Sequence, residues 1–277
     1  MVIQHNIAAV NSYRNLTQNT TNLNKNLEKL SSGFKINRAG DDAAGLAISE
    51  SMRNKINALN QAEDNANDAI GLIQTAEGAL TETHSMLERM TTLATQAANG
   101  TYGTSGEGAT ARSNIKLEVE ELENEINRIA TATSYNGNKL IDGTVSKLTF
   151  QIGATKGEDL TLQLSNMKTS GLGVNGMAAK MTQVSSAASA INTIRDAVNK
   201  VSSFRARLGA KQNRLEHTVN NLKVSNENLT SAESRIRDTD MAKEISAYTK
   251  NNILNQAAQS MLAQANQAPQ GTLQLLG

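Results

Sequence analysis

The feature that most constrains this fold is an apolar repeat of seven residues in the C-terminal half of the chain. It continues through eight positions: Ala187, Ile194, Val201, Leu208, Leu215, Leu222, Leu229 and Ile236. A repeat of this length is typical of a coiled-coil seam, because a spacing of 3.5 residues keeps one stripe of a helix against its partner. A second column, three residues earlier, is interrupted by Arg205, Gln212, Asn226 and Glu233. The repeat predicts a helix of roughly 50 residues, about 75 Å long.

A second long helix is predicted before residue 100. Its repeat consists of Met52, Leu59, Ala66, Ile73, Leu80, Leu87 and Ala94. Asp41 and Asp42 favour a helix start, where carboxylates meet the positive end of the helix dipole, and Asn99-Gly100 favours a stop. A third, shorter helix is predicted from apolar residues that alternate four and three apart: Ile115, Val119, Leu122, Ile126 and Ile129.

One β-hairpin is expected between the helices. Leu148, Phe150 and Ile152 alternate with polar residues, as do the leucines at 160, 162 and 164. The intervening segment 153–159 contains Gly157 and is typical of a turn. Two such strands do not make a sheet domain.

Both ends of the chain carry amphipathic helices that have no internal partner. The residues expected to pack in a polymer core are Ile3, Ile7, Leu23, Leu27, Leu30, Ile245, Leu254, Met261 and Leu262. An isolated helix of about 30 residues with one apolar stripe is marginal in water. We therefore expect the two ends to pair with each other, and then with identical copies. Segments 31–42 and 237–240 interrupt the repeat and are interpreted as the junctions.

The predicted fold is mainly α. It is a long coiled-coil-like helical bundle with one small β-hairpin region and with the termini paired as a second coiled coil. The expected division is 1–42 plus 236–277 as the terminal coiled coil, and 43–235 as the long-helix bundle with the hairpin at about 140–176. The near-absence of proline, one residue in 277, agrees with long uninterrupted helices.

Composition excludes several kinds of chemistry. The chain has no cysteine, which rules out disulfides, thiolate metal sites and cysteine nucleophiles. A net charge of +1 does not indicate a nucleic-acid or membrane-surface partner. His5, His84 and His217 lie in separate segments, so neither a metal site nor a catalytic histidine is expected. No cofactor is expected either. The N-terminus shows no pattern of a cleaved signal peptide, and no stretch has about 20 apolar residues.

A glycine motif leaves one enzymatic alternative open. Residues 171–176 read Gly-Leu-Gly-Val-Asn-Gly, with Asp196 twenty residues further on. This spacing is typical of dinucleotide binding only where the glycines follow a parallel strand and open a helix. Here they follow half of a hairpin, so we interpret them as a flexible loop. Dinucleotide binding by the purified chain would support the enzymatic alternative.

Several ordered motifs across the chain resemble bacterial flagellin. They begin with Leu-Ser-Ser-Gly-Phe-Lys-Ile-Asn-Arg-Ala-Gly-Asp-Asp-Ala-Ala-Gly-Leu-Ala-Ile-Ser at 30–49. Further matches lie at 73–80, 135–140, 208–217, 232–238 and 261–266. The resemblance implies a structural subunit, not an enzyme, that assembles with identical copies into the helical filament used for motility. Because about 40 residues separate Tyr135 from Gly176, we expect a minimal subunit without outer domains. A hook–filament junction protein is the alternative.

The resemblance also implies partners and a location. It implies an extracellular protein of the bacterial flagellum, exported by the flagellar type III apparatus, with filament cap and hook-associated proteins as neighbours. The export chaperone would hold the C-terminal segment, which ends with Leu273, Leu275 and Leu276. Host toll-like receptor 5 would contact Arg89, Leu93 and Glu118. Strongly recognised members carry charged residues where this chain has threonine at 91 and 92, which reduces the expected signalling.

Overall fold

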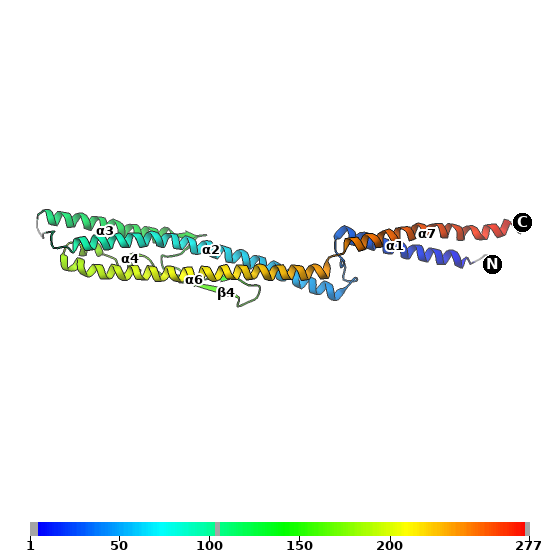
Figure 1. Ribbon diagram of the computed structural model, residues 1–277, viewed down its shortest axis with the longest axis horizontal. Helices are drawn as coiled ribbons and strands as arrows, with labels where there is room; N and C mark the ends of the chain where they lie inside the picture. The colour runs from blue at the N-terminus through cyan, green and yellow to red at the C-terminus, as the bar shows by residue number, and fades with distance from the viewer. Residues whose placement is uncertain (1–4, 103–105, 275–277) are drawn as a thin grey trace. The chain divides into compact units, whose positions relative to one another are not determined.

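The computed structural model describes residues 5–102 and 106–274, with side chains as far as residue 268. Its helices are α1 (Ile7–Ser32), α2 (Ala43–Ala97), α3 (Glu107–Ala132), α4 (Thr169–Leu172), α5 (Met177–Lys180), α6 (Val184–Arg237) and α7 (Met241–Gln274). Its strands are β1 (Ser134–Tyr135), β2 (Asn138–Lys139), β3 (Lys147–Gln151) and β4 (Asp159–Gln163). Long helices dominate, and the strands form small antiparallel pairs (Figure 1). The predicted mainly α class is confirmed.

The chain forms two compact units, residues 1–56 with 227–277, and residues 57–226. The boundaries expected from the sequence, after residue 42 and before residue 236, stay a prediction.

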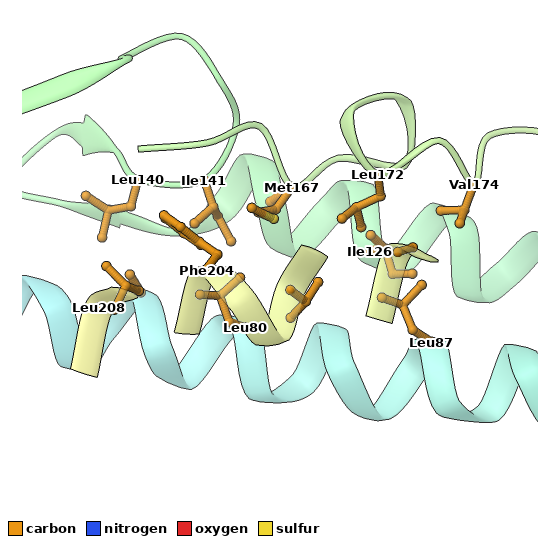
Figure 2. Close-up of a cluster of buried hydrophobic side chains, with 14 of the residues drawn as sticks. Leu80, Leu87, Ile126, Leu140, Ile141, Met167, Leu172, Val174, Phe204 and Leu208 are labelled. Carbon is orange, nitrogen blue, oxygen red and sulfur yellow. The ribbon is translucent and has the colours of Figure 1, made fainter. Parts of the chain in front are cut away.

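The larger unit is built around a continuous apolar core. Leu80 and Leu87 of α2 point toward Ile126 of α3 and toward Phe204 and Leu208 of α6 (Figure 2). All five side chains are at most 1% exposed. Both seven-residue repeats therefore face inward in this unit, as predicted. The apolar repeat of α3 faces the same core, because Ile115, Val119 and Ile126 are buried there.

Two of the four polar interruptions of the α6 repeat are paired with side chains of α2. The Arg205 guanidinium lies 3.5 Å from the carboxylate of Glu77. The Asn226 amide donates a hydrogen bond to the side-chain oxygen of Asn60. Polar pairs of this kind fix the register of two helices, because any other register leaves them without partners.

The predicted hairpin is confirmed. Strands β3 and β4 pair antiparallel, with Leu148 opposite Leu162 and Phe150 opposite Leu160. Its inner face joins the core, since Leu160 and Leu162 are buried. Gly157, in the connecting turn, has a φ of +95°, a conformation that favours glycine.

The glycine motif is only partly a loop, because residues 171 and 172 belong to α4 and residues 173–176 form the turn before α5. Residues 169–180 fold into α4 and α5, and the buried carboxylate of Glu123 accepts hydrogen bonds from the backbone N–H groups of Gly176 (2.9 Å) and Ala178 (2.8 Å). These groups lie at the start of α5, and the start of a helix is where a dinucleotide fold holds its phosphates. A carboxylate from the chain itself occupies that place, which argues against the dinucleotide alternative.

In the smaller unit, the two interruptions predicted as junctions meet. The backbone N–H of Lys35 donates to the carbonyl oxygen of Arg237 (2.6 Å), and that of Thr239 donates to the carbonyl oxygen of Gly33 (2.9 Å). The Arg237 guanidinium lies 4.7 Å from the centre of the Phe34 ring. It also donates to the Glu50 carboxylate at 2.7 Å. These contacts fasten the end of α1 to the break between α6 and α7.

The start of α2 agrees with the carboxylate signal in the sequence. Asp42 accepts a hydrogen bond from the backbone N–H of Gly45 (2.9 Å), which caps the helix. Asp41 accepts from the backbone N–H groups of Arg38 and Asn37. The Arg38 N–H, helped by that of Asn37, lowers the pKa of Asp41. The turn before α2 therefore keeps its charged acceptor at neutral pH.

Candidate assembly surface

The paired terminal helices meet through a polar seam. In α1 and in α7 as far as residue 268, the buried side chains are Asn26 and Asn255, each 9% exposed. Asn255 donates to the Thr20 hydroxyl at 2.7 Å. Asn26, with its amide oriented to satisfy both of its ends, donates to Glu244 (3.1 Å) and accepts from Asn251 (3.0 Å). The predicted pairing of the two ends is confirmed, and its most buried side chains are hydrogen-bonded asparagines.

Apolar side chains of the same helices face outward. The exposed ones are Ile7, Val10, Tyr13 and Leu27 on α1, and Met241, Ile245, Ile253, Leu254 and Met261 on α7. Ile7 and Ile253 are 68% and 61% exposed. Monomeric proteins rarely present so many large apolar groups on one element pair, and such surfaces mark sites of protein association. We call these nine residues the assembly surface.

The residues predicted to pack in a polymer core fall into three groups. Ile7, Leu27, Ile245, Leu254 and Met261 lie on the assembly surface, while Leu23, Leu30 and Leu262 are half-buried beside the polar seam. Ile3 lies outside the described residues. So do the side chain of Leu273 and the whole of Leu275 and Leu276. Sequence reasoning had not included Val10, Tyr13, Met241 and Ile253 among these core residues, although all four are apolar residues of amphipathic helices.

The three residues predicted for receptor contact do not all reach the surface. The Arg89 guanidinium donates to the Glu118 carboxylate at 2.7 Å, and both side chains are about half exposed. Leu93 is 1% exposed and packs in the core with Leu87 and Met90. Thr91 and Thr92 donate their hydroxyls to carbonyls of their own helix. This face therefore offers one ion pair to a partner, and its leucine points inward.

Neither a metal-holding cluster nor a membrane-spanning helix is found in the part of the chain that the structure describes. Across residues 5–102 and 106–274, no group of three His, Asp or Glu side chains is arranged to hold a metal ion. Within those same ranges, no helix combines the length and the apolar content needed to cross a bilayer.

These observations define a class of protein. It is a helical-bundle protein whose terminal helices pair through polar contacts and keep their apolar side chains available to another chain.

Comparison with known proteins gives the family. The model of the bacterial flagellin N-terminal helical region matches residues 3–146, and that of the C-terminal helical region matches residues 191–276. Flagellin of Halalkalibacterium halodurans is 51% identical over 276 residues, and flagellin of Bacillus subtilis is 50% identical over 306, with all of each chain covered in both cases. This chain belongs to the bacterial flagellin family.

A solved structure shows the same fold at low identity. A putative flagellar hook-associated protein from Vibrio parahaemolyticus superposes with a TM-score of 0.60 at 14% identity, over 72% of this chain and all of that chain. Identity this low shows the shared fold alone.

Proposed function

We propose that this chain is a structural subunit that self-assembles with identical copies into the helical flagellar filament used for bacterial motility. The observation that carries the proposal is the assembly surface, whose nine apolar side chains are 40–68% exposed in a single chain. A helical polymer follows when each copy contacts the next through two different faces that do not close into a ring. Coverage of whole flagellins at about half identity supports the same role.

The test is polymerisation of the purified chain, followed by electron microscopy. Filaments many subunits long, with a regular helical repeat, are expected. A chain that stays monomeric at every concentration, or forms only closed rings, would overturn the proposal. Short, capped oligomers would instead favour the hook–filament junction protein. The filament subunit is preferred because the full-length relatives are flagellins, whereas the likeness to the hook-associated protein is one of fold.

We further propose a structural and not a catalytic role, at an extracellular location reached through the flagellar type III apparatus. Family membership supports this destination. Filament cap and hook-associated proteins would be the neighbours at the two ends of the polymer.

The export chaperone is proposed to hold α7 before assembly, because α7 carries five residues of the assembly surface. Deleting residues 241–277 should abolish chaperone binding in a pull-down. Deleting residues 1–32, which removes α1, should preserve it and serves as the control. Retention by the chain that lacks 241–277 would contradict the proposal.

Recognition by toll-like receptor 5 is proposed to involve the exposed pair Arg89 and Glu118. Replacing Arg89 with Ala should weaken binding of the receptor ectodomain by roughly tenfold, because interfacial arginines often dominate such contacts. Arg128→Ala removes a similar exposed pair with Glu125 and should leave binding unchanged. Leu93→Ala should mainly lower bundle stability, by about 2–5 kcal/mol, because Leu93 is buried. Unchanged affinity of Arg89→Ala would refute the assignment.

A further inference from the structure

Charge is divided unevenly among the long helices of the 57–226 unit. Between residues 184 and 226, α6 carries seven basic and two acidic residues, whereas α3 carries six acidic and three basic residues. Figure 1 draws α3 and α6 on opposite sides of α2 in this unit. We call the α6 side the basic edge and the α3 side the acidic edge, although the whole chain is nearly neutral.

The basic edge contains a groove. Two adjoining cavities of about 350 and 470 Å³ lie against α6 and share Arg207 in their linings. One cavity is also bordered by α4 and the other by β4. We call the two cavities together the α6 groove. Its lining includes the buried leucines 162, 172 and 208, and the cationic side chains of Lys200, Arg207 and Lys211. No carboxylate is part of either lining.

The cations of the α6 groove have no anionic partner among the described residues. The Lys200 ammonium donates to the carbonyl oxygen of Leu172 at 3.0 Å. The Arg207 guanidinium lies over the Phe204 ring, 5.5 Å from its centre. In the same unit, Arg205 and Lys223 of α6 do pair with carboxylates of α2. The positive charge of the groove is therefore not neutralised by a carboxylate of the described residues.

The acidic edge offers an exposed apolar side chain and charges opposite to those of the groove. Leu117 of α3 is 57% exposed, and in this unit only Val224 is a comparably exposed large apolar side chain among the described residues. Glu120 and Glu121 lie one turn further along the same face and are exposed. Neither forms an ion pair with a described residue, unlike Glu118, which pairs with Arg89. The edge is thus an apolar projection followed by two free carboxylates.

We propose that the α6 groove of one subunit receives the Leu117–Glu121 edge of α3 from a second copy. Leu117 would cover the apolar floor, and Glu120 and Glu121 would face Arg207 and Lys211. The groove and the edge are different surfaces of one chain, so the contact is heterologous and repeats along a polymer without closing on itself. The inference rests on the proposed filament role and names a subunit contact outside the terminal helices.

Charge reversal on each side provides the test. The groove variant carries Arg207→Glu and Lys211→Glu, and the edge variant carries Glu120→Lys and Glu121→Lys. Each alone should raise the critical concentration for polymerisation by about tenfold or more, since like charges then meet. The chain carrying all four changes should recover to within about threefold of wild type. An equimolar mixture of the groove and edge variants should copolymerise, because each supplies what the other lacks.

The controls separate this inference from the proposed function. Arg195→Glu reverses an exposed charge on α6 outside the groove lining and should polymerise like wild type. Circular dichroism should show that all variants are folded. Groove and edge variants that polymerise like wild type, or a folded four-change chain that does not recover, would overturn the inference and leave the filament role standing. A wild-type chain that never polymerises would instead remove the proposed function.

Discussion

Replacing both Ile245 and Ile253 with Asp should abolish filament formation by a chain that otherwise folds normally. Both side chains are more than half exposed on α7, so their replacement should change the stability of the single chain by less than about 0.5 kcal/mol each. Covering an isoleucine on assembly contributes about 1.5–3 kcal/mol, and a carboxylate buried without a partner adds a further penalty. The critical concentration should therefore rise at least roughly 100-fold.

Sedimentation and electron microscopy measure this effect directly. Gln256→Asp places the same charge on an exposed polar position of α7 and should change the critical concentration much less. If the double variant forms filaments at the wild-type concentration, the assembly surface does not contact other subunits.

Phe204→Ala should cause the largest loss of stability among single changes in the 57–226 unit. Phe204 is 0% exposed and lies where α6 faces Leu80 of α2 (Figure 2). Removing a buried phenylalanine costs about 3–5 kcal/mol, because the apolar contacts are lost and a cavity remains. Urea unfolding followed by circular dichroism should show the loss. Ser203→Ala, at the neighbouring exposed position, should stay within about 0.5 kcal/mol of wild type. A loss below 1 kcal/mol for Phe204→Ala would contradict the core described here.

The long helices could be predicted because a seven-residue repeat is a local pattern, and the residues of the repeat are the ones that the folded bundle buries. Leu80 and Leu208 belong to such repeats, and both are buried as expected. Asp42 also indicated the start of α2, because a capping side chain binds a backbone N–H only three residues away. The short helices α4 and α5 could not be predicted, because the Glu123 carboxylate that fastens α5 lies 53 residues from Gly176. A contact over that separation leaves no periodic signal.

A buried arginine was missed for a similar reason. Arg112 is 2% exposed and donates to the carbonyl oxygens of Asn99 and Tyr102, just beyond the end of α2. Such a residue interrupts an apolar period and looks like a solvated position in the sequence. Only the fold shows that it closes the loop between α2 and α3.

The terminal helices were recognised from their apolar stripes, but the polar side chains between the two helices were not. Asn26 and Asn255 occupy the interior of the pair, whereas Ile253 faces outward. Periodicity identifies a face but not its partner, since a neighbouring copy and a helix of the same chain leave the same pattern. Leu93 had the same ambiguity, and the structure assigns it to the bundle core.

The asparagines inside the α1–α7 pair have a consequence for when this pair becomes rigid. Water can replace hydrogen bonds between amides at little net free-energy cost. The hydrogen bonds of Asn26 and Asn255 should therefore add little to the stability of the pair in a solitary subunit. Neighbouring copies would add more, by covering the outward isoleucines and leucines. We therefore expect the stiffness of a filament to be a collective property of its subunits.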